Sequence, residues 1–204
     1  MLTATEYLMR ESLPLYRVHE AIFDFCRGRS ELTIFGAQAV NIYVPEPRMT
    51  QDVDLFSPTP RETAEALATA LNGAFHVAVR VREIAGGKAY RVYQLRNEGN
   101  RHFADVRVME FSLDDATERD GIRYASLPLM IAMKVSALAK RRLAPKGATD
   151  LADVRRLLLA HPELRNAEGP VTEALHRIGA NAEVARVWEE LRNEPAVVDE
   201  DDYA

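Results

Sequence analysis

One stretch, residues 32–56, constrains the fold more than any other, because it joins two apolar segments through a glycine and ends in two aspartates. Residues 32–35 are apolar and stop at Gly36, and the positions that follow have the mixed apolar spacing of one or two helical turns. Two prolines then break the helix. Residues 51–56 alternate polar and apolar side chains. The stretch therefore predicts a strand, a tight turn, a short helix and a second strand.

The alternation places Asp52 and Asp54 on the same face of the second strand. Two carboxylates this close repel each other unless a cation lies between them. Magnesium binds through one or two carboxylates and completes its shell with water and phosphate oxygens. An isolated pair with this spacing more often faces solvent, but a glycine turn that opens a helix also presents backbone N–H groups to an anion. Together, Gly36 and the two aspartates predict a phosphate-binding turn beside a metal-binding pair.

These residues resemble the signature of the nucleotidyltransferase superfamily, a glycine pair followed by D-h-D. The stretch GAQAVNIYVPEPRMTQDVDLF is similar, more narrowly, to the AbiEii and MenT-like bacterial toxin nucleotidyltransferases, with the matching positions Gly36, Ala37, Arg48, Thr50, Asp52 and Asp54. Ala37 departs from the pattern, since the family often has serine or glycine there. An alanine keeps the backbone donor and loses a hydroxyl, so we expect weaker nucleotide binding.

The resemblance implies Mg²⁺-dependent transfer of a nucleoside monophosphate from a nucleoside triphosphate, ATP among them, to a hydroxyl acceptor. It assigns Asp52 and Asp54 to magnesium, and Gly36, Ala37, Arg48 and Thr50 to the nucleotide. It also requires a third carboxylate from a later strand beside the D-h-D strand. Asp105 matches in order and type, both as a metal ligand and as a catalytic carboxylate, although a simple ion pair with a nearby arginine explains it equally well.

A second block, in residues 127–159, resembles the family's lysine helix followed by an aspartate-led helix. Lys134 matches the lysine, with nucleotide-binding and catalytic roles, and Asp150 matches the aspartate, as the other candidate for the third carboxylate. Each has a plain alternative. A lysine in an apolar helical stripe usually extends its amine to the surface, and Asp150 and Asp153 suit the first turn of a helix.

The resemblance implies a mixed α+β fold: a small nucleotidyltransferase-like sheet with flanking helices, followed by a C-terminal helical subdomain. Three alternating segments, 76–83, 89–96 and 102–109, add to the two earlier strands to give five strands, with the last three as antiparallel neighbours. We place the α/β core at 1–112, the helical subdomain at 113–195 and an acidic disordered tail at 196–204.

Composition and charge bear on where the protein is found and what it binds. No run of eighteen apolar residues occurs in the 204-residue chain, and its N-terminus lacks the order of a signal peptide, so we expect a cytoplasmic protein. The formal net charge of −5 argues against a nucleic-acid partner, but four of those charges come from the acidic residues at 199–202. The single cysteine, Cys26, has no partner for an internal disulfide.

The acceptor is left open by the sequence. The relatives it resembles act on transfer RNA as toxins paired with an antitoxin protein, and others modify aminoglycoside-type small molecules. Arg80, Arg82 and Arg91 are predicted to lie on one face of a hairpin, where they would contact an RNA backbone or serve only solubility. The competing hypothesis is a catalytically degenerate protein that binds a nucleotide or a partner without turnover.

Overall fold

The computed structural model describes residues 13–97, 99–109 and 116–195. They belong to two compact units. The first comprises the chain up to Ala39 together with Arg48–Ala125, and the second comprises Val40–Pro47 together with the chain from Ser126 onward. The predicted acidic tail, 196–204, lies outside the described residues.

The first unit is built on a mixed sheet, as predicted, but the described residues form seven strands rather than five. Their order across the sheet is β3 (Val79–Ile84), β4 (Ala89–Gln94), β5 (Arg101–Val108), β2 (Val53–Ser57), β1 (Thr33–Phe35), β7 (Ile122–Tyr124) and β6 (Thr117–Arg119). Strands β3, β4 and β5 are antiparallel neighbours, which confirms that prediction. Strand β2 lies between β5, to which it is parallel, and β1, to which it is antiparallel.

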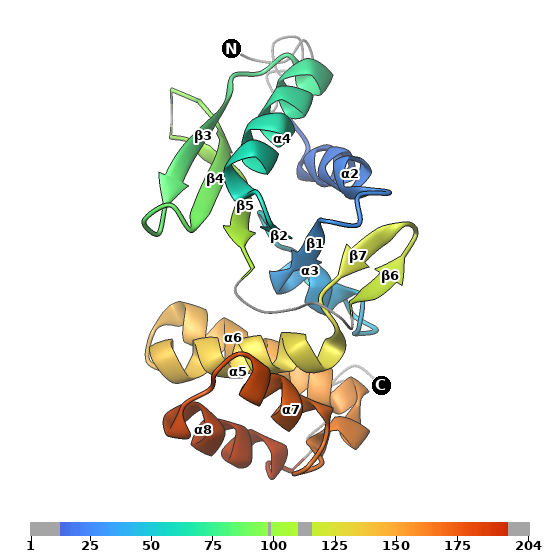
Figure 1. The fold of residues 1–204 in the computed structure, drawn as a ribbon, viewed down its shortest axis with the longest axis vertical. Helices are drawn as coiled ribbons and strands as arrows, with labels where there is room; N and C mark the ends of the chain where they lie inside the picture. The colour runs from blue at the N-terminus through green and yellow to red at the C-terminus, as the bar shows by residue number, and fades with distance from the viewer. Residues whose placement is uncertain (1–12, 98, 110–115, 196–204) are drawn as a thin grey trace, which may run out of the picture. The chain divides into compact units, whose positions relative to one another are not determined.

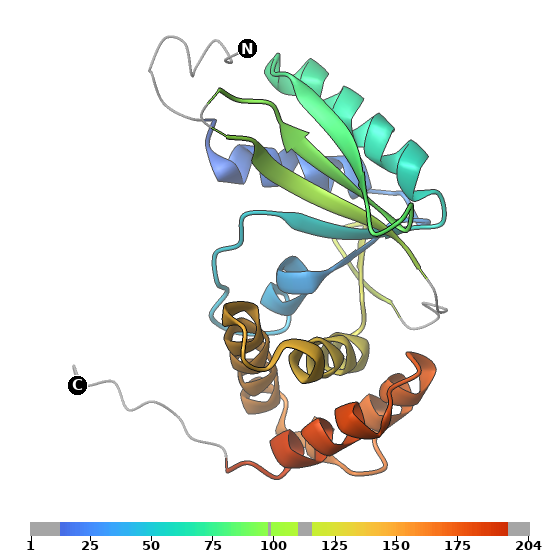
Figure 2. The same cartoon turned by 90° about the vertical axis from the view of Figure 1, so that its left-hand side faces the viewer.

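Two helices, α2 (Leu15–Cys26) and α4 (Pro60–Phe75), cover one face of this sheet (Figures 1 and 2). The strand positions paired with one another on that face are apolar and buried, for example Val53, Ala104 and Val92. The intervening positions carry the polar and charged side chains, so the alternation seen in the sequence separates a core face from a second face. Both predicted aspartates lie on the second face.

The two extra strands occupy residues 117–124, where only helices were expected. They form a hairpin whose turn residues, Asp120 and Gly121, have φ values of +53° and +73°. Positive φ at both turn residues is the geometry that Asp-Gly favours in two-residue hairpins. Strand β7 then joins the sheet beside β1.

Near its end, helix α4 is tied to β3, because the Asn72 side chain bonds both backbone groups of Val79, at 2.9 and 3.3 Å. The helix continues until His76, whose left-handed backbone (φ +52°) stops it.

The second unit is helical in its described part. It contains α5 (Leu127–Arg141), α6 (Pro145–Ala160), a short 3₁₀ turn (Pro162–Arg165), α7 (Pro170–Arg177) and α8 (Ala182–Arg192). Helix α5 packs against α6, α7 and α8 and contributes much of the apolar core. Helices α7 and α8 lie on either side of Gly179. Among the described residues, no helix is both long enough and apolar enough to span a membrane.

Candidate functional site

Asp54 lies against the glycine that opens the short helix α3 (Gly36–Asn41). A Cβ atom on Gly36 would lie 2.1 Å from Asp54 Oδ2, closer than any side chain can approach. Gly36 also has φ +69°, a backbone conformation that glycine adopts without strain. The position therefore requires glycine for two separate reasons, and one of them is the carboxylate itself.

Strand pairing brings the third predicted carboxylate beside the second. Asp54 on β2 is the direct register partner of Asp105 on β5, and Asp105 is in turn the partner of Arg91 on β4. Residues opposite each other in register point to the same face of a sheet. A row of charged side chains thus runs across three strands.

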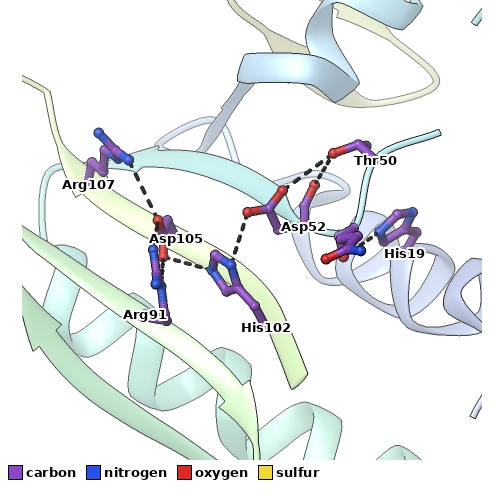
Figure 3. A network of polar contacts seen from close by, with 8 residues as sticks. His19, Thr50, Asp52, Arg91, His102, Asp105 and Arg107 are labelled. Carbon is purple, nitrogen blue, oxygen red and sulfur yellow. Dashed lines mark hydrogen bonds and ion pairs between the residues drawn. The ribbon is translucent and has the colours of Figure 1, made fainter. Parts of the chain in front are cut away.

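Asp105 is buried, although the sequence placed it on an outward face, because cations surround its carboxylate (Figure 3). Arg91 donates two parallel hydrogen bonds, each 2.9 Å long, and His102 Nε2 lies 2.9 Å from Oδ1. Arg107 adds a longer ion pair of 3.6 Å. Paired arginine donors of this kind are among the strongest hydrogen bonds in proteins.

His102 also reaches Asp52, since its Nδ1 lies 3.0 Å from Asp52 Oδ2. A break in the strand register explains how it gets there. Val92 pairs with Ala104 and Tyr93 with His102, so Phe103 has no partner on β4. The extra residue turns His102 to the face of Asp105, as β-bulges often do.

These contacts shift the pKa values of the three groups. Burial would lower the pKa of His102, but its hydrogen bonds and charge interactions with Asp105 and Asp52 raise it to about 9. Burial would raise the pKa of Asp105, yet hydrogen bonds from His102 and Arg91 hold it well below its usual range. The pKa of Asp52 is lowered, chiefly by its hydrogen bond with His102. At neutral pH the ring is therefore a cation between two carboxylates.

The loop before Asp52 is tied to α2 and α3. Thr50 Oγ1 donates to Asp52, at 3.3 Å to the backbone oxygen and 3.4 Å to Oδ1, and Arg48 Nη1 donates to the Met49 carbonyl. His19 on α2 contacts the Gln51 carbonyl and the Gln38 side chain. Burial lowers the pKa of His19, which keeps its ring neutral. Ala37 begins the first turn of α3 beside Gly36.

In the second unit, Lys134 lies in a different charge cluster. Its Nζ contacts Asp150 Oδ1 at 3.1 Å and Asp153 Oδ2 at 2.7 Å, and Arg141 contacts Asp150 at 2.6 Å. The lysine side chain is only 12% exposed, so it does not extend to the surface as expected. Helix α6 begins at Pro145, which also corrects the expected place of Asp150 and Asp153 in the first turn of that helix. The cluster joins α5 to α6.

Comparison with solved structures gives three informative likenesses. The Megavirus polyadenylate synthase matches with a TM-score of 0.59 and 18% identity over 76% of this chain, which spans 32% of that protein's length. JHP933 from Helicobacter pylori matches with a TM-score of 0.55 and 12% identity over 94% of both chains. The antibiotic-resistance factor ANT(2'')-Ia matches with a TM-score of 0.51 and 17% identity, over 80% of this chain and 88% of that one.

The chain has the nucleotidyltransferase fold. At these identities the likeness concerns the fold alone. No protein-family model matches the chain, and a search of curated proteins found no match. The narrower resemblance to AbiEii and MenT-like toxins stays a prediction.

Within this fold, Asp52 and Asp54 fit a magnesium ion by donor chemistry, because one or two carboxylates are enough for it. The Asp54 carboxylate rests against Gly36, where a Cβ atom would lie 2.1 Å from Oδ2, so the glycine leaves this carboxylate its position. Among the described residues, however, no group of three or more histidine, cysteine or acidic side chains is placed to hold a metal. The oxygens of Asp105 are bound by Arg91 and His102.

His102 is the member of this site that the sequence did not reveal. By simple alternation it falls on the core face with Ala104 and Val106, and only the unpaired Phe103 moves it to the other face. Glycine or proline in a strand often marks a bulge, but β5 contains neither, so the sequence gives no sign of the bulge at Phe103. Arg91 was noticed only as part of a possible RNA-binding face.

Proposed function

We propose that the protein transfers a nucleoside monophosphate from a nucleoside triphosphate to a hydroxyl acceptor in the cytoplasm. The observation that supports this most strongly is the contact between Asp54 and Gly36, in register with Asp105, within a nucleotidyltransferase fold. In the proposed reaction the acceptor hydroxyl oxygen attacks the α-phosphorus and its proton passes to solvent water. The bond from the α-phosphorus to the oxygen that bridges the α- and β-phosphates breaks, and pyrophosphate leaves with both electrons of that bond.

Asp52 and Asp54 are the proposed magnesium ligands. Bound there, magnesium supplies positive charge that stabilises the phosphate oxygens during the in-line displacement. The backbone at Gly36 and Ala37 and the Arg48 side chain are the proposed nucleotide contacts in the first unit, and Thr50 supports Asp52 through its hydrogen bonds.

Asp105 is the better of the two candidates for the third carboxylate. Both candidates are buried and paired with cations, but Asp105 is the register neighbour of Asp54, whereas Asp150 lies on α6 of the second unit. The lowered pKa of Asp105 makes it a weak proton acceptor. Its proposed contribution is thus a fixed negative charge that holds its neighbours. The paired state of Lys134 argues for a structural role over triphosphate binding.

For the acceptor we propose RNA, with the end of a transfer RNA as the specific case. On the charged face, Arg82 is the register partner of Arg91, and Arg80 is the partner of Tyr93. Arg91 is bound to Asp105, but Arg80 and Arg82 are exposed on the edge strand, and the Arg82 guanidinium lies 5.9 Å from the centre of the Tyr93 ring. Arginines that bind phosphates beside a ring that stacks on a base are typical of single-stranded RNA binding.

The direct test is incubation of the protein with each α-³²P-labelled nucleoside triphosphate and total transfer RNA, in magnesium and in chelator. We expect label in the RNA only with magnesium, and a loss of that label in Arg80→Glu/Arg82→Glu. An aminoglycoside panel in place of RNA tests the small-molecule alternative. If no acceptor is labelled while nucleotide still binds, the degenerate, non-enzymatic hypothesis replaces this one. A transfer RNA modification would further favour a toxin with a cognate antitoxin.

A further inference from the structure

We propose that His102 is a positioning residue that fixes the direction of the Asp52 carboxylate by linking it to Asp105. The inference rests on the proposed function, because it concerns the carboxylates assigned to magnesium. It goes beyond the family resemblance, whose motif includes no residue at this position.

The two aspartates of the pair are held in different ways. Asp54 lies inside β2, with strand partners on both sides, Phe35 and Asp105, and its carboxylate rests against Gly36. Asp52 precedes the first residue of β2, and the sheet gives it no register partner. Sheet pairing therefore fixes the direction of the Asp54 side chain but leaves that of Asp52 to its side-chain contacts.

Two side chains supply those contacts. Thr50 is a weak support, since its hydroxyl lies 3.4 Å from Asp52 Oδ1. His102 is a strong one, at 3.0 Å from Oδ2. A donor–acceptor distance of 3.0 Å is in the normal range for an N–H···O hydrogen bond, whereas 3.4 Å is longer than normal for an O–H···O hydrogen bond. Loss of the imidazole would thus leave Asp52 with its weaker side-chain contact.

His102 is itself rigidly held, which a positioning residue must be. Its other nitrogen is bound to Asp105 at 2.9 Å, and Asp105 is fixed by two bonds from Arg91. A series of side-chain contacts thus runs from β4 through β5 to the start of β2, in the order Arg91, Asp105, His102 and Asp52 (Figure 3). The bulge at Phe103 places the His102 ring in this series of contacts.

Outer partners of this kind orient metal-binding carboxylates, and their loss typically weakens metal binding by about 10- to 100-fold. We therefore expect His102→Ala to raise the magnesium concentration needed for half-maximal nucleotide binding by about 10- to 100-fold. His102→Gln keeps one amide donor and should show a smaller increase. Nucleotide affinity at saturating magnesium should change little in either variant.

The experiment measures the melting temperature of the full-length protein across a series of magnesium concentrations, with an α,β-methylene nucleoside triphosphate present. In this analogue a CH₂ group replaces the oxygen between the α- and β-phosphates, so the nucleotide binds but cannot be cleaved there. All four bases are tried on the parent, and the analogue with the largest shift is used. His76→Asn is the matched control, because His76 lies at the end of α4, and asparagine tolerates its left-handed backbone. Asp105→Asn tests the link, since it should raise the magnesium requirement in the same way and add little to His102→Gln.

A raised magnesium requirement in His102→Ala and His102→Gln, with His76→Asn unchanged, supports the inference. A parent-like magnesium requirement in a folded His102→Ala variant overturns it and leaves the proposed function intact. If the parent itself shows no magnesium-dependent shift with any analogue, the proposed function and this inference fail together. Lowered melting in chelator with an unchanged magnesium requirement would identify His102 as purely structural.

Discussion

The two units each contain a cluster of aspartates and cations, and the clusters differ in how completely they are enclosed. In the helical unit, Asp150 and Asp153 are 2% and 0% exposed, and Lys134 and Arg141 match them in number. On the sheet, Asp105 is enclosed in the same way, at 4% exposed, but Asp52 is one-third exposed and stands beside Asp54, whose carboxylate rests against Gly36.

Burial of the charged side chains and equal numbers of opposite charges are typical of a structural ion-pair cluster. Removing one partner from such a cluster leaves a buried charge that water cannot reach. The partial exposure of Asp52 suits a site where a ligand binds. The comparison therefore supports the proposal that the helical cluster contributes to stability and the sheet cluster to chemistry, although the sequence motif points to both.

The largest stability effect should come from the helical cluster. Lys134→Ala removes the amine that lies between Asp150 and Asp153, and breaking a buried ion pair typically costs about 3–5 kcal/mol. Urea unfolding would measure the loss. The control is Lys140→Ala, on the exposed end of the same helix, which should stay within about 0.5 kcal/mol of the parent. Equal stability in the two variants would contradict a structural role for Lys134.

The glycine contact gives the next largest effect. Gly36→Ala puts a methyl group into the Asp54 carboxylate, so we expect a lower melting temperature and loss of nucleotide transfer. The matched control is Gly28→Ala: Gly28 has nearly the same φ, +73°, and nothing within 4 Å of its Cβ position. Strained backbone alone costs about 1–3 kcal/mol, and both variants share that cost. Transfer kept in Gly36→Ala would contradict the proposed role of the contact.

A smaller effect concerns pH and the loop that precedes Asp52. Because burial lowers the pKa of His19, the unfolded chain binds more protons than the folded one near and below pH 6.5, so stability falls as pH decreases through that range. His19→Gln keeps hydrogen-bonding ability and cannot titrate. Urea unfolding at pH 7.5 and at pH 5.5 should show a smaller acid-induced loss in the variant than in the parent. An identical loss in the two proteins would exclude His19 as a source of the acid-induced loss of stability.

The smallest effect is expected at an exposed ion pair in the helical unit. Arg142 and Glu190 lie 2.8 Å apart, but their side chains are 55% and 38% exposed. Exposed pairs typically contribute about 0.2–1 kcal/mol. A double-mutant cycle with Arg142→Ala and Glu190→Ala should give a coupling energy in that range. A coupling energy as large as the stability loss in Lys134→Ala would contradict the argument that burial decides how much an ion pair contributes to stability.

Local patterns in the sequence predicted much of the sheet. Period-two alternation located β2, β3, β4 and β5, and the nucleotidyltransferase signature correctly placed Asp105 on a strand next to Asp54. These features depend on which side chains alternate along a single strand, and the sequence displays that directly. The β6–β7 hairpin was missed because its strands are three residues long, even though Asp120-Gly121 is a strong turn signal.

Pairings between distant residues could not be predicted in the same way. Lys134 reaches Asp150 and Asp153 only because α5 packs on α6, and alternation gave His102 the wrong face because of one unpaired residue. The sequence also treated Asp52 and Asp54 as a repelling pair. The cation that relieves the charge of Asp52 comes from β5, fifty residues away.

The central claim is that the sheet cluster performs magnesium-dependent nucleotide transfer, and Asp54→Asn tests it most directly. Asparagine has nearly the same shape as aspartate but lacks the charge that binds a metal. The variant should still unfold in one cooperative transition, while transfer of labelled nucleotide in magnesium falls by at least about 100-fold. A folded Asp54→Asn protein that transfers label at the parent's rate would contradict the account.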